Sequence, residues 1–207
     1  MLGTVHLSTF VMSGILLNIY PGPDTLYIIS RSLSQGKGAG IVSALGIGTG
    51  ALIHTLLAGI GLSSLLSASP MAFYGVKLLG AVYLIYLGIR IILAKAGADK
   101  TGSYLENQTR LQIYKQGLLT NLFNPKVALF FLSFLPQFVD PVDNYGPLSF
   151  LFLGLIILTT GTLWCLFVAV FSASVSETIR KHQKVHAVFE KLTGIIFLGL
   201  GLNIIRP

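Results

Sequence analysis

Long apolar runs separated by short polar connections make up almost the whole chain. Each run has about the 20 residues that a helix needs to cross a bilayer. The runs cover approximately residues 7–30, 41–66, 70–94, 117–139, 146–171 and 189–205. The pattern therefore predicts an all-α integral membrane protein with about six transmembrane helices.

The composition excludes an ordinary soluble domain. Hydrophobic residues make up 53% of the 207 residues and charged residues only 10%, whereas about a quarter of an average soluble domain is charged. The chain has a single cysteine, Cys165, and it lacks the spacings of His, Cys and carboxylates that mark metal sites and the common hydrolase motifs. We therefore predict no cofactor, no metal and no enzymatic activity.

The basic residues predict how the chain is oriented in the membrane. The net charge of +7 does not indicate nucleic acid, because the basic residues lie in loops between apolar runs. Most of them belong to three alternate loops: Arg31, Lys37, Arg90, Lys95, Lys100, Arg110, Lys115, Arg180, Lys181, Lys184 and Lys191. By the positive-inside rule these loops are cytoplasmic, which places both termini and the acidic turn at 140–145 on the outer side.

The two halves of the chain are similar to each other. Residues 14–30 align without gaps on residues 117–133, with Asn18 opposite Asn121, and a shorter match joins the third and sixth runs. Because each half has three spans, two such halves must lie in the bilayer with opposite orientation, as in many secondary transporters. A chance match between leucine-rich helices is the alternative. The predicted division is residues 1–94 and 117–207 as three-helix repeats and 95–116 as a cytoplasmic linker.

Helix-breaking residues interrupt the first and fourth runs at equivalent places. Pro21, Gly22 and Pro23 break the first run, and Asn124 and Pro125 break the fourth. Proline removes a backbone donor and clashes with the preceding turn. Irregular backbone at membrane depth is tolerated only inside protein or beside a watery cavity. The paired breaks therefore predict a central substrate site.

Each break carries one charged residue, Asp24 in the first run and Lys126 in the fourth. A charge at that depth costs at least about 2.5 to 3.5 kcal/mol, so it needs a reason to be there. We hypothesise that Lys126 and the amides of its half-helix hold a substrate carboxylate, while Asp24 attracts an ammonium group or a coupling proton. The alternative is a direct ion pair between Asp24 and Lys126 that only joins the two halves.

Three further polar residues lie in the apolar runs near the predicted site. Asn18 and Asn121 precede the two breaks and either contact the substrate or satisfy carbonyls that the prolines free. His54 lies near the centre of the second run. It is either a neutral histidine bonded to a neighbouring helix or a proton carrier, because histidine titrates near neutrality.

The motifs at the two breaks resemble those of a known family. The residues are NIYPGPD at 18–24, NLFNPK at 121–126 and FFLSFLPQF at 130–138. With them, essentially the whole chain resembles the LysE family of amino-acid exporters, in particular its RhtB-type branch for homoserine, threonine and leucine efflux. The resemblance implies a secondary exporter in the bacterial inner membrane that is driven by protons or by the membrane potential.

The predicted partners are an amino-acid-like small solute, the lipid bilayer and, because one bundle has few helices with which to surround a solute, a second copy of the chain. The leading interpretation is alternating access between the two halves, with both termini in the periplasm. A passive small-solute channel would use the same breaks without coupling. A non-transporting membrane subunit would use the glycine-rich helix faces to pack against a partner.

Overall fold

The computed structural model describes residues 2–93, 107–142 and 145–181, together with residues 195, 198, 199 and 202. The greater part of the predicted linker at 95–116 and of the sixth apolar run at 189–205 lies outside the described residues. The shorter repeat match in the sixth run lies outside them too. The predictions for these segments are therefore not tested by the structure.

The described part of the chain is helical and contains no β-strand, so the prediction of an all-α protein is confirmed. An isolated β-bridge between Thr4 and Val139 is the exception to the helical pattern. The elements are α1 (Leu7–Ile19), α2 (Pro23–Gln35), α3 (Lys37–Ala68), α4 (Pro70–Leu93), α5 (Arg110–Leu122), α6 (Pro125–Phe134), the 3₁₀-helix η1 (Leu135–Phe138) and α7 (Pro147–Lys181).

Several of these helices have the length and apolar composition of membrane spans. Among the described residues, α3 and the Pro147–Ser172 part of α7 meet both conditions. A third span results if Arg110–Leu122 and Lys126–Phe138, which meet at an angle of 47°, are counted as one bent span. Apolar spans in an all-helical chain fit an integral membrane protein, and the arrangement of six spans in inverted repeats stays a prediction.

Both predicted helix breaks are confirmed. The first apolar run divides after Ile19, and α2 starts with Pro23 in its first turn, where a missing N–H costs nothing. The fourth run divides after Leu122. There the side chain of Asn124 caps α6 by accepting a hydrogen bond from the backbone N–H of Lys126, at 3.0 Å.

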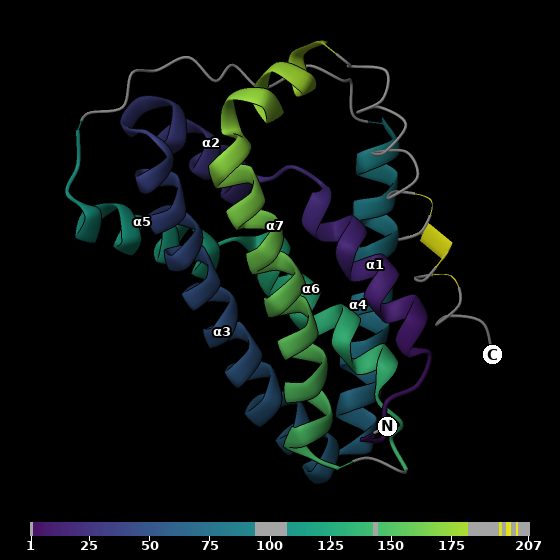
Figure 1. Cartoon of the computed structure of the whole chain (residues 1–207). Coiled ribbons are helices and arrows are strands. Elements are labelled where there is room, and N and C mark those ends of the chain that lie inside the picture. Colours follow the sequence, from purple (N-terminus) through teal and green to yellow (C-terminus); the bar gives the residue numbers. More distant parts are fainter. Residues whose placement is uncertain are drawn as a thin grey trace.

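The long helices α3 and α7 form the centre of the bundle (Figure 1). Helix α3 packs most extensively against α7 and α5, and α2 packs against both α3 and α7. Helix α4 packs against α6, and α1 packs against α7. In Figure 1, α5 lies across the bundle while α6 continues downward, so the break turns the chain into the interior. The two breaks thus lie among α2, α3, α5 and α7.

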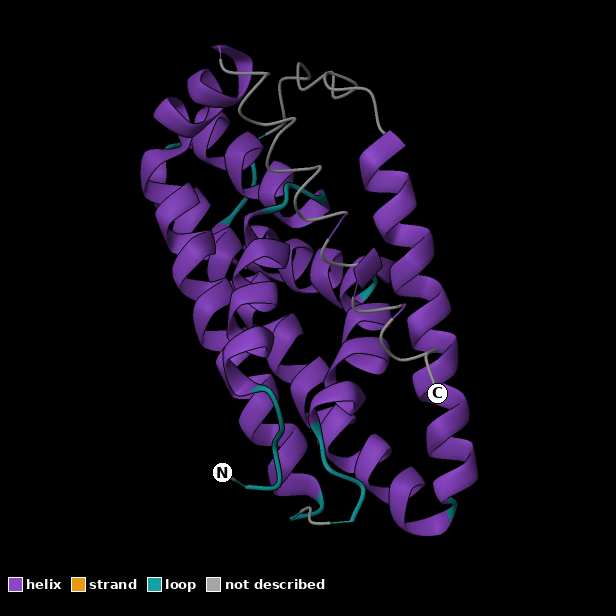
Figure 2. Ribbon diagram, turned by 90° about the vertical axis from the view of Figure 1, so that its right-hand side faces the viewer, coloured by secondary structure: helices purple, strands orange, loops and turns teal. Residues whose placement is uncertain are grey.

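The loops divide between two ends of the bundle. At one end, Gln35 and Gln108 exchange two hydrogen bonds, of 3.0 and 3.2 Å, so the turn after α2 lies beside the start of α5. At the other end, the Ser149 hydroxyl donates to the carbonyl of Leu2 at 2.7 Å. Figure 2 shows the N-terminal segment beside the turn that precedes α7. This alternation agrees with the loop order that the basic residues predict.

Glycines let α3 and α5 approach until their backbones touch. A Cβ on Gly46 would collide with the carbonyl oxygen of Tyr114. A Cβ on Gly50 would lie 2.8 Å from the side-chain oxygen of Asn121, and one on Gly117 would lie 2.7 Å from a backbone oxygen of α3. Because the hydrophobic effect does not drive helices together in lipid, close packing of this kind provides the attraction between them. The α3–α5 contact therefore holds the second break against the centre of the bundle.

Replacing Gly50 with alanine should destabilise the protein, because its methyl group meets backbone and amide atoms that cannot move aside. Overpacking of this kind costs about 1–3 kcal/mol. The measurement is the midpoint of thermal unfolding in detergent. Gly61→Ala is the control on the same helix, since nothing lies within 4 Å of the Cβ that it would add. Equal midpoints for the two variants would show that the glycine contact does not hold α3 and α5 together.

Candidate functional site

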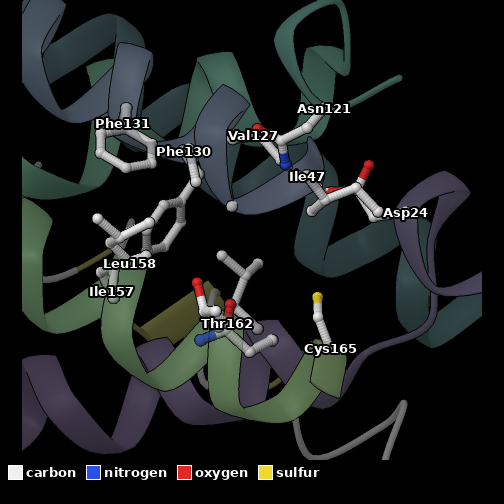
Figure 3. A pocket seen from close by; sticks show the side chains of 15 residues that line it. Asp24, Ile47, Asn121, Val127, Phe130, Phe131, Ile157, Leu158, Thr162 and Cys165 are labelled. Carbon is white, nitrogen blue, oxygen red and sulfur yellow. Dashed lines mark hydrogen bonds between the residues drawn. The ribbon is translucent and has the colours of Figure 1, made fainter. Parts of the chain in front are cut away.

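A small cavity lies between the two helix breaks (Figure 3). Its volume is about 70 Å³. Most of its wall is apolar and comes from α3, α6 and α7, with the side chains Ile47, Val127, Phe130, Phe131, Ile157 and Leu158. The polar side chains on the wall are Asn18, Asp24, Asn121, Thr162 and Cys165. Three of the residues predicted from the sequence, Asn18, Asp24 and Asn121, thus meet at one cavity.

Asp24 is the one carboxylate on the wall of this cavity, and two amides hold it in place. Asn121 donates to one carboxylate oxygen at 2.7 Å, and Asn124 donates to the other at 3.2 Å. Asp24 also lies in the first turn of α2, where the helix dipole favours a negative charge. A carboxylate can accept about four hydrogen bonds, so it keeps acceptor capacity for a ligand after these two.

Asn124 connects the two halves at the second break. Its side-chain oxygen caps the N-terminus of α6, while its amide nitrogen donates to Asp24. The cap fixes the orientation of the amide, because only the oxygen can accept the N–H of Lys126. Asn124 is 4% exposed, so neither bond competes with bulk water. The residue that follows, Pro125, supplies the break and α6 begins there.

Lys126 points toward the first break and not into the cavity. Its ammonium donates to the carbonyls of Leu17 and Tyr20, at 3.2 and 3.0 Å, and lies 4.6 Å from the centre of the Tyr20 ring. These carbonyls belong to the C-terminal end of α1, where the helix dipole favours a cation. Lys126 is absent from the cavity wall. Its ammonium thus satisfies backbone groups that the Pro21–Pro23 break leaves without helical partners.

The two charged residues do not form an ion pair with each other in this structure. Asp24 is bonded to two amides of the second half, and Lys126 is bonded to two carbonyls of the first half. Gly22 lies beside the ammonium: a Cβ on Gly22 would be 3.7 Å from Nζ of Lys126. In this conformation each charged side chain instead makes its hydrogen bonds to the opposite half of the chain.

His54 lies behind the cavity wall, next to the second break. Its Nε2 atom is 3.4 Å from the backbone oxygen of Asn121, and its ring stacks on Phe131 with ring centres 5.6 Å apart. The side chain is buried. This geometry agrees with a histidine bonded to a neighbouring helix. The ring also contacts Asn121, the residue whose side-chain amide donates to Asp24. A role of His54 in proton movement stays a hypothesis.

Asn18 and Asn121, which the predicted repeat would make equivalent, have different partners. Asn121 donates to Asp24, whereas Asn18 donates to the hydroxyl of Thr160 at 3.1 Å. Neither side chain satisfies a carbonyl freed by the prolines among the hydrogen bonds of the described residues.

Thr162 and Cys165 were not predicted as site residues, because α7 carries no charge in its middle. The short polar stretch at 159–162 within an apolar run was the available signal.

Packed side chains lie on both sides of the cavity. Toward the end of the bundle that holds the N-terminal segment, Phe130 and Phe134 stack with ring centres 4.4 Å apart, and Phe134 also stacks on Phe10. Toward the end with the basic loops, the Tyr27 hydroxyl donates to the carbonyl of Ile113 at 2.9 Å. One turn further along α2, the buried Arg31 donates to glutamines of the α5 side: Gln108 at 2.6 Å and Gln116 at 3.1 Å.

These features define a class of protein: a helical membrane protein with a mostly apolar cavity that carries one carboxylate and lies between two broken helices. Comparison with known families then identifies the group. The model of the LysE type translocator family matches residues 15–207, and the chain belongs to this family. The predicted resemblance is therefore confirmed.

Several curated relatives match over nearly the whole chain. An uncharacterized membrane protein of Pseudomonas aeruginosa is 33% identical over 207 residues, covering 98% of this chain and 96% of the relative. The uncharacterized membrane protein YrhP of Bacillus subtilis is 33% identical over 205 residues, covering 95% and 97%. The leucine efflux protein of Salmonella choleraesuis is 29% identical over 202 residues, covering 98% and 95%. No solved structure matches the chain.

Removing the ammonium of Lys126 should weaken the fold, because it leaves the carbonyls of Leu17 and Tyr20 without their donor. Lys126→Met keeps the length of the side chain and should lower the free energy of unfolding by about 2 kcal/mol, the worth of a hydrogen bond to a charged group. Thermal unfolding in detergent measures the change. The matched control is Lys115→Met, since Lys115 is exposed on α5. If both variants unfold at the wild-type temperature, the contact does not stabilise the break.

Proposed function

We propose that this protein is a secondary transporter that exports amino acids or close derivatives, of the homoserine, threonine and leucine kind, across the bacterial inner membrane. The observation that carries the proposal is the cavity between two broken helices, with one carboxylate and an otherwise largely apolar wall. Membership of a translocator family and the leucine efflux relatives support the same function.

The chemistry of the cavity suits a small amphipathic solute with an amino group. The Asp24 carboxylate attracts an ammonium group or a coupling proton, and Asn121 and Asn124 hold it in position. The aliphatic and aromatic wall receives an apolar side chain. Lys126 remains part of the proposed site through its half-helix and its charge, which balances that of Asp24, and His54 is the proposed partner in proton coupling.

The size of the cavity supports a transporter that changes shape. Small-molecule sites commonly have volumes of about 300–1,000 Å³, several times the 70 Å³ found here. Both sides are packed, by the phenylalanines at one end and by the contacts of Tyr27 and Arg31 at the other. An amino acid needs more space than this cavity offers, so helices must move apart before the site can hold one. Alternating access therefore accounts for the structure better than a permanently open channel.

The proposed orientation follows from the loops. The end that holds Gln35, Lys37 and Arg110 faces the cytoplasm by the positive-inside rule. The end with the N-terminal segment and the turn before α7 then faces the periplasm, and a second three-helix repeat of inverted orientation would return the C-terminus to the same side. Export would carry the solute from the end with the contacts of Tyr27 and Arg31 toward the end with the stacked phenylalanines.

Counterflow in liposomes tests the function directly. Purified protein is reconstituted, and uptake of labelled leucine, threonine and homoserine is followed with and without an imposed pH gradient. Saturable uptake that rises with the gradient is expected for a proton-coupled exporter. Flux that neither saturates nor responds to pH would favour the passive channel. Complete absence of flux with folded protein would favour a non-transporting membrane subunit.

Replacing Asp24 with asparagine should abolish counterflow of the transported amino acid or reduce it at least tenfold, because the amide cannot offer a negative charge to an ammonium group or a proton. The matched control is Asp140→Asn, which makes the same change in the turn after η1, outside the cavity wall. A variant of Asp24 that keeps full, saturable flux would contradict the proposed role of the carboxylate. His54→Asn, measured in the same assay, separates proton coupling from binding.

Cys165 provides a reporter of the cavity that needs no substitution, because it is the chain's single cysteine and lies on the cavity wall. A small membrane-permeant maleimide should label it slowly in liposomes, and a saturating transported amino acid should reduce the labelling rate severalfold. Cys165→Ser, which should not label at all, shows that the signal comes from this thiol. A rate that stays the same at saturating substrate would place the substrate outside this cavity.

A further inference from the structure

We propose that the α7 wall of the cavity binds the substrate's carboxylate, through the hydroxyl of Thr162 and the side-chain amide of Asn18. The proposal rests on the export function and narrows the substrate to an amino acid with a free carboxylate. It assigns the carboxylate to neutral donors that the charge pattern of the sequence did not reveal. Asp24 on the opposite wall would then hold the substrate's ammonium group.

Thr162 is the threonine on the cavity wall, and its hydroxyl, like that of Thr159 beside it in α7, has no hydrogen bond to its own helix among the described residues. Thr49, Thr55 and Thr160 each donate to the carbonyl four residues earlier, at 3.0, 2.9 and 2.8 Å. This is the usual way for a helix to satisfy a hydroxyl away from water. Within the described part of the chain, the hydroxyl of Thr162 has no such bond, and the residue lies on the cavity wall. It is therefore a donor available to a ligand.

A glycine keeps the space in front of this hydroxyl open. Gly48 of α3 also lies on the cavity wall, and a Cβ there would be 3.2 Å from the oxygen of Thr162. Any side chain at Gly48 would thus fill the approach to the hydroxyl. Figure 3 shows Thr162 and Cys165 on one side of the cavity, with Asp24 and Asn121 on the other.

Asn18 adds a second donor on the cavity wall. Its amide nitrogen carries two hydrogens and makes one hydrogen bond among the described residues, to Thr160. The amide lies over Gly161, where a Cβ would come within 3.1 Å of the side-chain oxygen of Asn18. Because Gly161 has no side chain, Asn18 can reach the surface of α7 next to the residue that precedes Thr162. Two neutral donors therefore lie on the wall of the same cavity.

The balance of charge favours an intact amino acid over an amine or an ester. Asp24 and Lys126 contribute one negative and one positive charge to this region, and they cancel. A zwitterion adds no net charge to it, whereas an amine or an amino-acid ester adds a positive charge in a site shielded from water. Burying an uncompensated charge is expensive. Neutral donors on α7 can satisfy the carboxylate of the zwitterion without disturbing this balance.

The test compares Thr162→Val, which removes the hydroxyl but keeps the shape, with Thr162→Ser, which keeps the hydroxyl. In leucine counterflow, Thr162→Val should raise the half-saturating concentration about tenfold, since a hydrogen bond to a charged group is worth at least that factor. Thr162→Ser should stay within about twofold of the wild type. Leucinamide carries a neutral amide in place of the carboxylate, and a hydrogen bond to a neutral group is weaker, so its inhibition constant against labelled leucine should change less in Thr162→Val than the half-saturating concentration of leucine does.

A second variant, Gly48→Ala, tests the same site in case Thr162→Val does not fold. Gly48→Ala should also raise the half-saturating concentration for leucine, while Gly61→Ala on the same helix should not. Wild-type half-saturation for leucine in folded Thr162→Val protein, or an equal loss of affinity for leucinamide, would overturn the carboxylate site and leave the export function standing. Failure of the wild type to move any amino acid would overturn both.

Discussion

The structure depends on how the backbone groups freed at two helix breaks are satisfied away from water. At the first break, the ammonium of Lys126 binds the last carbonyls of α1. At the second, Asn124 caps α6 and donates to Asp24. A side chain of the second break thus satisfies backbone groups of the first, and the carboxylate of the first break accepts a hydrogen bond from the cap of the second. Because an unsatisfied backbone group in hydrocarbon costs several kcal/mol, the two irregular segments stabilise each other and are held together at one depth in the bundle.

The cavity is a consequence of this arrangement. Two irregular segments side by side leave space that straight helices would fill, and α3 and α7 close that space with small or apolar residues such as Gly48, Ala51 and Gly161. The charges serve two purposes at once: they satisfy backbone and amide groups, and they give the cavity one ionisable wall. The carboxylate of the proposed transport site thus also takes part in the contacts that hold the two breaks together. This also explains how so short a chain accommodates a polar site in an apolar setting.

Much of the fold could be predicted from the sequence, because membrane helices are recognised by their length and apolar composition, and because proline and glycine mark the breaks directly. Asp24, Asn18 and Asn121 were placed near a central site by the same reasoning. The partners were not predictable. The repeat suggested equal roles for Asn18 and Asn121, but α7 presents Thr160 to one and α2 presents Asp24 to the other. Lys126 was expected to face a solute, whereas its long side chain reaches the end of α1. Thr162 carries no charge and has a second hydroxyl neighbour in Thr159, so only its place on the cavity wall distinguishes it.

The close contact between α3 and α5 has a mechanical consequence. Helix α3 comes from the first half of the chain and α5 from the second, yet their glycines bring the two backbones into direct contact. Sliding or separating these helices would break contacts between their backbones, so we expect α3 and α5 to move together. Helices α4 and α6 also pack against each other across the halves. An opening of the bundle as proposed above would therefore not follow the boundary between the two halves of the sequence.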